Sequence, residues 1–294
     1  MIDGIIIKAI SGFYYVDDGD TVYECKSRGI MKKDGVTPCV GDNAAISVGP
    51  SAGGKHIGVV ERIGERRNLL KRPPVANVDR LYIISSFENP APNTLIIDKL
   101  ICSCEAKGIE PAVVFNKSDM GSFERFEAIY NSAGIRTHTV SCVTGEGIEQ
   151  LYKSFGEGIS VLTGNSGVGK SSLINKMFPA LSLKTGEISE KLGRGRHTTR
   201  HIELFKNGMG GFIADTPGFA AVDSELMPKD ELACNFREFA DYLGKCRFTS
   251  CSHTCEKGCA VLAAVSEGKI SRERHDNYCA IYRDLSAINS WELK

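Results

Sequence analysis

The first seventy residues alternate between apolar and polar positions in short runs, with glycine and aspartate between the runs. Alternation with a period of two is typical of half-buried β-strands, and Gly and Asp are typical of the turns that join them. Several short strands in so small a segment predict a barrel, and the oligonucleotide-binding (OB) fold is the leading interpretation. The predicted strands are residues 5–10, 13–16, 21–25, 43–48 and 56–63.

Basic and aromatic residues occur together on this predicted barrel. Cations beside aromatic rings suit attraction to a nucleic-acid backbone combined with stacking of the bases. The alternative is a solvated rim whose tyrosines lie half in the core, and the residue types alone do not separate the two. The residues concerned are Lys26, Arg28, Lys32, Lys33, Tyr14, Tyr15 and Tyr23.

The pattern changes after a basic segment, residues 64–76, which contains two adjacent prolines. Because proline pairs resist both helix and central strand, we expect a linker and a domain boundary here. Strands and helices then alternate, which predicts a parallel sheet with helices on both faces. Cys102 and Cys104 point to different faces of one predicted helix, so we expect them to pack rather than to form a site. The predicted strands are 80–85, 111–115, 136–140 and 159–162, and the helices are 94–107, 123–133, 148–153 and 171–178.

A phosphate-binding loop pattern lies between the last of these strands and the last helix. Two glycines stand five positions apart, Gly164 and Gly169, and Lys170 and Ser171 follow. Glycines allow backbone N–H groups to converge on phosphate oxygens, and the helix N-terminus adds partial positive charge. Lys170 is expected to reach the β- and γ-phosphates, and Ser171 to hold Mg²⁺. The predicted loop residues are Gly164, Asn165, Ser166, Gly167, Val168, Gly169, Lys170, Ser171 and Ser172.

A second polar motif, Asn116-Lys117-Ser118-Asp119, follows an earlier strand at the sheet edge where ligands bind. Asp119 can accept hydrogen bonds from the ring N–H and the exocyclic amine of guanine. Adenine offers an acceptor at the ring position, so this motif favours GTP over ATP. We expect Asn116 to orient the loop, the Lys117 stem to cover the ring, and Ser141-Cys142 to donate a backbone N–H to the guanine carbonyl.

The two remaining nucleotide elements come after the phosphate loop. A long polar loop, residues 182–201, contains Thr198 and Thr199, one of which is expected to bind Mg²⁺ and the γ-phosphate, with Thr199 favoured. A strand pair, 201–205 and 211–214, follows. Asp215 then binds Mg²⁺ through water, and the Gly218 N–H senses the γ-phosphate. The predicted Mg²⁺ residues are Ser171, Thr199 and Asp215.

The order of these elements is permuted, because base recognition precedes phosphate binding. In Ras-type hydrolases, a Gln shortly after the γ-phosphate-sensing glycine orients the attacking water. Here that glycine, Gly218, is followed by Phe219, and no Gln is available. The substitute available in this sequence is His197, beside Thr198, since histidine is the commonest general acid or base. A solvated loop histidine is the alternative.

The C-terminal region contains clustered cysteines. Cys246, Cys251, His253 and Cys259 supply three thiolates and one imidazole, which suits tetrahedral Zn²⁺ in a structural site. Cys255 is a further thiol that could replace His253. The expected helices are 226–242, 260–267 and 272–293. Nearby basic residues either contact phosphates or form a solvated face: Lys245, Arg247, Lys257, Lys269, Arg272, Arg274 and His275.

Charge and hydropathy limit the classes of function. The 36 Lys and Arg balance 36 Asp and Glu, so any nucleic-acid contact must come from local patches. The chain has no run of about 18 apolar residues and no signal-peptide pattern at its start, so we expect no membrane span and no membrane partner. Eleven cysteines do not make a complete set of intramolecular disulfides, and their clustering indicates metal.

The order of barrel, permuted GTPase and Cys-Cys-His-Cys segment resembles the RsgA (YjeQ) family of small ribosomal subunit biogenesis GTPases. The resemblance covers nearly the whole chain. Lys257 stands where many members have Pro, and a basic N-terminal extension that some members carry is missing. The stretches that carry the resemblance are 67–73, 76–79, 116–119, 164–173, 193–199, 215–219 and 246–261.

The resemblance implies a cytoplasmic GTPase stimulated by the small ribosomal subunit, acting late in its maturation and binding its rRNA, with GTP or GDP, Mg²⁺ and one structural Zn²⁺. It also implies an rRNA-binding barrel, and His197 matches the family's switch histidine. The expected domains are an OB barrel (1–70), a permuted GTPase domain (71–222) and a helical zinc domain (223–294), in a monomer. Two other classes compete: an RNA-binding checkpoint in which hydrolysis is incidental, and a metabolic kinase, which Asp119 argues against.

Overall fold

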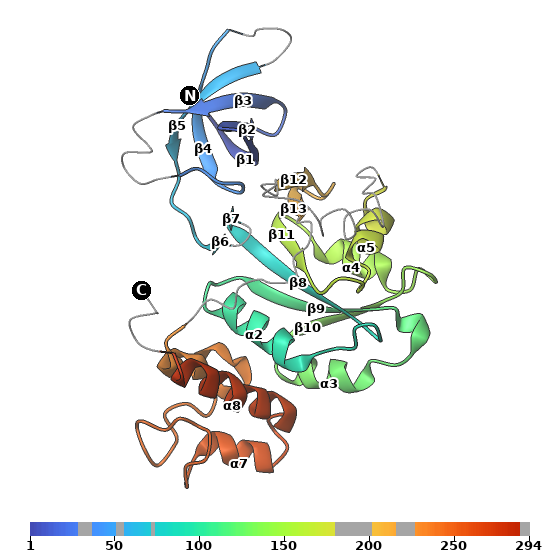
Figure 1. The fold of residues 1–294 in the computed structure, drawn as a ribbon, viewed down its shortest axis with the longest axis vertical. Coiled ribbons are helices and arrows are strands. Elements are labelled where there is room, and N and C mark those ends of the chain that lie inside the picture. Colours follow the sequence, from blue (N-terminus) through green and yellow to red (C-terminus); the bar gives the residue numbers. More distant parts are fainter. Residues whose placement is uncertain (29–36, 51–55, 72–73, 180–201, 216–226, 289–294) are drawn as a thin grey trace. The chain divides into compact units, whose positions relative to one another are not determined.

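The computed structural model describes residues 1–28, 37–50, 56–71, 74–179, 202–215 and 227–288 (Figure 1). The chain forms two compact units. The first comprises Met1–Leu81, Tyr152–Ser166 and Lys170–Val222. The second comprises Tyr82–Leu151, Gly167–Gly169 and Asp223–Lys294.

The N-terminal strands close into a barrel, as the alternating pattern predicts. They are paired in the order β1-β2-β3-β5-β4, and β4 pairs back with β1. Tyr14 and Tyr23 lie in the barrel core, each only 8% exposed. They therefore do not form a stacking surface, and Tyr15 is the tyrosine of this set outside the core. The strands are β1 (Ile2–Ile10), β2 (Phe13–Asp17), β3 (Val22–Ser27), β4 (Asn43–Val48) and β5 (His56–Ile63).

The basic segment after the barrel, predicted as a linker whose prolines resist helix and central strand, contains two short paired strands. Strand β6 (Leu69–Lys71) pairs antiparallel with β7 (Pro74–Ala76). Val75, within β7, is fully buried and bridges in parallel to Val40 of the barrel. Proline is tolerated at the first position of a strand, where Pro74 lies. Long-range pairing, which the local sequence does not reveal, therefore determines this segment.

The first unit also contains the strand that leads into the phosphate loop. Strand β11 (Gly158–Thr163) pairs parallel with β13 (Gly211–Asp215), and β12 (Glu203–Lys206) pairs antiparallel with β13. The predicted strand pair after the long polar loop is thereby confirmed. Helix α5 (Lys170–Met177) follows the loop, with Leu173, Ile174 and Met177 buried.

The second unit contains the strands that precede the predicted guanine motif. Strand order β10-β9-β8 and the helices between the strands confirm the predicted alternation. Strands β9 and β10 are parallel, so their carboxyl ends lie at the same edge. Cys102 and Cys104 are both buried, and burial raises the pKa of both thiols, as expected for packing residues. The elements are β8 (Val78–Ser86), α2 (Thr94–Glu105), β9 (Glu110–Asn116), α3 (Glu124–Ser132), β10 (Arg136–Val140) and α4 (Ile148–Ser154), of which β8 begins in the first unit and α4 ends in it.

The C-terminal region packs on α2, beside which α8 lies (Figure 1). The prediction of a single helix over residues 226–242 is wrong. Two short 3₁₀ helices, η4 (Lys229–Asn235) and η5 (Arg237–Phe239), take its place, because Phe236 is extended between them. That break allows Phe236 and Phe239 to enter one buried cluster with Tyr278. Helices α7 (Ala260–Ser266) and α8 (Arg272–Ser286) are present, and α8 ends earlier than predicted. Among the described residues, every helix is too short or too polar to cross a membrane.

Candidate nucleotide and metal sites

The predicted guanine-recognition motif begins where β9 ends. Asn116 is the last residue of β9 and is 2% exposed. Lys117 has a left-handed φ of 67°, which turns the chain out of the strand into the short 3₁₀ helix η1 (Ser118–Met120). Its Nζ donates to the carbonyl of Glu88 at 3.4 Å. The motif therefore lies at the carboxyl end of a parallel strand, as the sequence predicts.

Ser141 and Asp119 are in contact. The Ser141 hydroxyl donates to Asp119 Oδ1 at 2.5 Å. Ser141 Oγ also accepts from the backbone N–H of Val143 at 3.1 Å and of Thr144 at 3.2 Å. Ionised carboxylate oxygens each accept more than one bond, so Asp119 retains acceptor capacity for a base. Cys142 Sγ lies 3.8 Å from Asn116 Oδ1. Two side-chain pairs therefore connect the ends of β9 and β10: Asp119 with Ser141, and Asn116 with Cys142.

Asn116 also holds the backbone of the phosphate loop within the second unit. Its Nδ2 donates to the carbonyl of Val168 at 2.8 Å. Gly169 has a φ of 89°, and a Cβ there would lie 2.3 Å from Asn116 Nδ2. Glycine is therefore needed at this position both for its conformation and for the space that the Asn116 amide occupies. Asn116 therefore connects the end of β9 to the backbone of the predicted phosphate loop.

Lys170 contacts the start of the same loop. Its Nζ donates to the carbonyls of Gly164 at 2.5 Å and Asn165 at 2.8 Å. Burial lowers the pKa of Lys170 to about 8. A phosphate beside the ammonium would favour the charged form and raise that pKa. Ser166 and Gly167 are exposed at the loop tip, and Ser171 and Ser172 begin helix α5.

Several predicted residues lie outside the described part of the chain. These are His197, Thr198, Thr199 and Gly218. Asp215 is the last residue of β13, and its backbone is paired with Glu203. Since β13 is parallel to β11, Asp215 ends the strand next to the one that leads into the phosphate loop.

The predicted metal ligands come together. One donor atom from each of Cys246, Cys251, His253 and Cys259 lies within 4.8 Å of the others. Cys246 Sγ is 3.8 Å from Cys259 Sγ, and His253 Nδ1 is 3.5 and 3.4 Å from these two sulfurs. Tetrahedral ligands at about 2.3 Å from zinc are about 3.8 Å apart, so the donor set fits the ion. Cys255 is exposed and is not part of the cluster, which favours His253 as the fourth ligand.

Glu256 supports the loop that carries the predicted metal ligands, and this role was not predicted from the sequence. Its carboxylate accepts from the backbone N–H groups of Ser252 at 2.7 Å, Thr254 at 3.1 Å and Cys255 at 3.1 Å. Burial raises its pKa, but hydrogen bonds from the Ser252 hydroxyl and from backbone N–H groups outweigh burial and lower the pKa to about 2. An acidic residue inside a Cys-His loop is the signal that could have identified it.

Arg274 and His275 correct the suggestion that the basic residues of this region all face outward. Both are buried. Arg274 Nη1 donates to Asp98 Oδ1 at 2.6 Å, and its Nε and Nη2 donate to the two Glu238 oxygens at 2.5 and 3.0 Å. These bonds join α8 to α2 and to η5 within the second unit. The basic residues of the set that are exposed are Lys245, Arg247, Lys257, Lys269 and Arg272.

A phosphate loop after β11 and a guanine motif after β9, earlier in the chain, define a P-loop GTPase with permuted element order. Two solved structures share this fold. YjeQ from Thermotoga maritima matches with a TM-score of 0.83 and 33% identity, covering 98% of this chain and 99% of that one. YloQ, described as a circularly permuted GTPase, matches with a TM-score of 0.80 and 31% identity, covering 97% and 95%.

Sequence comparison gives the family. The RsgA GTPase model matches residues 63–225, and the RsgA N-terminal domain model matches residues 3–54. Relatives named small ribosomal subunit biogenesis GTPase RsgA, from Caldanaerobacter subterraneus and Halalkalibacterium halodurans, are 44% and 40% identical. The matches cover 97% and 96% of this chain and 96% of each relative. The chain belongs to the RsgA GTPase family and is a GTP hydrolase.

Replacing Cys259 with alanine is expected to abolish stoichiometric zinc binding, because three ligands hold the ion much less tightly than four. The matched control is Cys255→Ala, which removes an exposed thiol of the same loop. Metal analysis of the purified variants gives the answer. We expect about one zinc per chain in the control and well below that in Cys259→Ala. Equal metal loss in both variants would contradict the assigned ligand set.

Proposed function

We propose that this GTPase acts late in maturation of the small ribosomal subunit, is stimulated by that subunit and binds its rRNA. The observation that carries the proposal is the match, over nearly the whole chain, to relatives named for this role. A permuted GTPase joined to both a barrel and a metal-ligand cluster is an unusual combination, and this chain has all three parts. The protein would act in the cytoplasm as a monomer.

The nucleotide site in this proposal combines the motifs described above. Asn116, Lys117 and Asp119 would bind guanine together with Ser141 and Cys142. The Asn116–Val168 hydrogen bond supports this, because it links the base motif to the loop expected to hold the phosphates. Residues 164–172 would bind the phosphates. Ser171, Thr199 and Asp215 would hold Mg²⁺, the Gly218 N–H would sense the γ-phosphate, and His197 would orient the attacking water.

The barrel would supply the rRNA contact. Lys26 lies over the Phe13 ring at 5.1 Å, and Lys8 lies over Tyr15 at 6.0 Å. Cations paired with partly exposed aromatic rings suit single-stranded nucleic acid. Zinc at the Cys-Cys-His-Cys cluster would be structural, since four protein ligands leave no open position. The proposed domains are 1–70, 71–222 and 223–294.

A GTPase assay titrated with purified small subunits tests the proposal. Stimulated turnover with a GTP preference over ATP is the expected result. The alternative function, an RNA-binding checkpoint with incidental hydrolysis, is favoured by Phe219 at the position after the switch glycine. Tight GTP-dependent binding to subunits without stimulated turnover would support that alternative. An unchanged stimulated rate in His197→Ala would remove His197 from the mechanism.

A further inference from the structure

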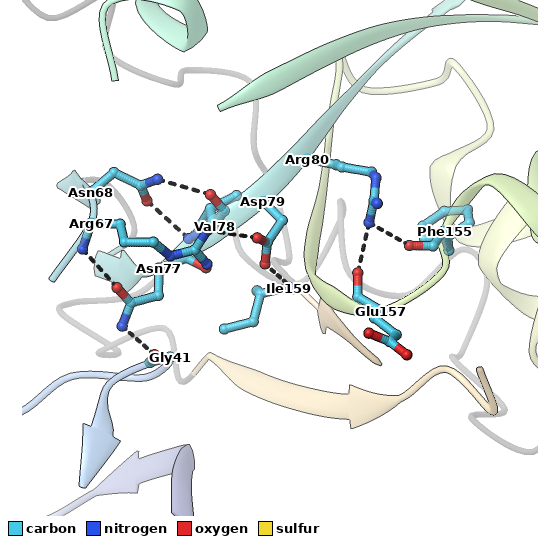
Figure 2. Close-up of polar contacts among 10 residues, drawn as sticks. All are labelled: Gly41, Arg67, Asn68, Asn77, Val78, Asp79, Arg80, Phe155, Glu157 and Ile159. Atoms are coloured by element: carbon cyan, nitrogen blue, oxygen red, sulfur yellow. Dashed lines mark hydrogen bonds and ion pairs between the residues drawn. The ribbon is translucent and has the colours of Figure 1, made fainter. Parts of the chain in front are cut away.

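The junction between the barrel and the phosphate-loop strand is a continuous series of side-chain hydrogen bonds (Figure 2). We define the junction as Arg67, Asn68, Asn77 and Asp79, all in the first unit. Asn68 pairs with the backbone of Val78 through both ends of its amide, each bond 2.9 Å long. This amide therefore acts like a strand neighbour and fixes the entry into β8.

Asn77 connects the junction to the barrel. It is 4% exposed and has a left-handed φ of 56°, which asparagine adopts more readily than most residues. Its Nδ2 donates to the carbonyl of Gly41 at 3.0 Å, and its Oδ1 accepts from the Arg67 N–H at 2.9 Å. A Cβ on Gly41 would lie 2.1 Å from the Ala76 carbonyl oxygen, so glycine allows the barrel turn to approach this closely.

Asp79 connects the junction to β11. Arg67 Nη1 donates to Asp79 Oδ1 at 2.8 Å, and Arg67 Nη2 donates to the carbonyl of Asn77 at 3.1 Å. The other oxygen, Asp79 Oδ2, accepts from the backbone N–H of Ile159 at 2.7 Å. A Cβ on Gly158 would lie 2.3 Å from this oxygen, so glycine there leaves space for the carboxylate. Both carboxylate oxygens are therefore engaged, one by the linker and one by β11.

Strand β11 carries this connection to the phosphate loop. It runs from Gly158 to Thr163, and Gly164 is the next residue. At about 3.3 Å per residue, the loop begins about 17 Å from Ile159. From Ile159 to Thr163 every residue of β11 is buried. Because close-packed interiors transmit displacement instead of absorbing it, a shift at Ile159 moves the start of the loop.

We propose that Asp79 is a positioning residue for GTP hydrolysis, holding β11 so that the phosphate loop is placed correctly, and that Arg67 and Asn77 tie this support to the barrel. The inference rests on the phosphate loop being the nucleotide site, as proposed above. It assigns these residues a role in turnover, although none of them belongs to a nucleotide motif.

Asp79→Asn is the direct test, because an amide offers one acceptor oxygen where the carboxylate offers two. We expect kcat/KM for GTP to fall about tenfold. A misplacement of about 1 Å can lower the rate about 100-fold, and losing one of the two acceptor bonds should shift β11 by less than that. We also expect faster hydrogen exchange at residues 159–163. The matched control is Lys206→Ala, which removes a cation about as exposed as Arg67 from its ion pair with Asp17 of the barrel, at 3.0 Å, without touching β11. Its kcat/KM should stay within about twofold of the parent.

Arg67→Ala provides a second variant if Asp79→Asn does not fold. The double variant Arg67→Ala/Asp79→Asn should be no slower than Asp79→Asn alone, because both changes break one series of bonds. Asn77→Gly keeps the left-handed backbone, removes the bond to Gly41, and should lower kcat/KM in the same direction. A purely structural role would lower the unfolding temperature but leave kcat and KM of the folded protein unchanged.

Lys170→Ala separates failure of this inference from failure of the nucleotide site. If Lys170→Ala loses GTP binding while Asp79→Asn and Arg67→Ala keep the parental kcat/KM and exchange, the positioning role is overturned and the site stands. If Lys170→Ala binds GTP like the parent, the site itself is misplaced and the inference falls with it. If Lys170→Ala loses GTP binding and Asp79→Asn has a lower kcat/KM, while the Lys206→Ala control keeps the parental kcat/KM, the positioning role is supported.

Discussion

Replacing Lys170 with alanine is expected to lower kcat/KM for GTP by about 100-fold or more, the range seen when one preorganised charge-stabilising donor is removed. The ammonium lies on the carbonyls of Gly164 and Asn165, at the loop expected to hold the β- and γ-phosphates. Partial burial makes its charge more effective there than it would be in water. Steady-state turnover together with equilibrium GTP binding measures the effect.

Lys176→Ala is the matched control for this variant. Lys176 is on the same helix, α5, and is exposed in its last turn. The two variants therefore remove the same charge and side chain from opposite ends of one helix. The control should retain parental turnover. A comparable fall in both would show that overall charge or helix stability, rather than contact with phosphate, governs the rate.

Replacing Asp119 with asparagine is expected to reverse the base preference. Guanine presents two donors to the carboxylate, and asparagine can accept only one of them while its own N–H₂ group faces the other. Unsatisfied buried polar groups cost about 1–3 kcal/mol each, so GTP affinity should fall at least about tenfold. Xanthosine triphosphate has a carbonyl in place of the exocyclic amine, and that carbonyl can accept from the new amide. It should therefore bind Asp119→Asn more tightly than GTP does.

The control for the base preference is Glu124→Gln, which neutralises a carboxylate of the same unit in the first turn of α3. It should keep the parental order of GTP over xanthosine triphosphate. Competition binding with both nucleotides measures the preference for each variant. If Asp119→Asn still prefers GTP, then Asp119 does not read the base edge, despite its contact with Ser141.

Features that depend on local spacing could be predicted from the sequence. The phosphate loop, the guanine motif and the metal-ligand set each occupy a short stretch in which residue type and spacing carry the chemistry. Their order along the chain also predicts the permutation, which the likeness to YloQ confirms. Asn116 shows how far this extends: its orienting role was expected, but its particular partner, the Val168 carbonyl, required the structure.

Features that depend on distant partners could not be predicted. Arg274 is indistinguishable in sequence from an exposed helical arginine, and its burial follows from Asp98, which lies far earlier in the chain. The β6–β7 hairpin depends on the pairing of Val75 with Val40, against the local signal of adjacent prolines. The break at Phe236 likewise follows from packing in a cluster that includes Cys102 of α2.

The Arg274 contacts have a consequence for truncation of the chain. A chain cut before η4 would lose Arg274 and Asn277, which donate to the two Asp98 oxygens. It would also uncover the face of α2 that bears Cys102. This face packs in an apolar cluster with Leu232, Phe236 and Tyr278, and exposing buried apolar surface costs about 25 cal/mol per Å². The region that carries the Cys-Cys-His-Cys cluster is therefore an integral part of the second unit, and a fragment that ends before η4 is expected to be less stable than the full chain.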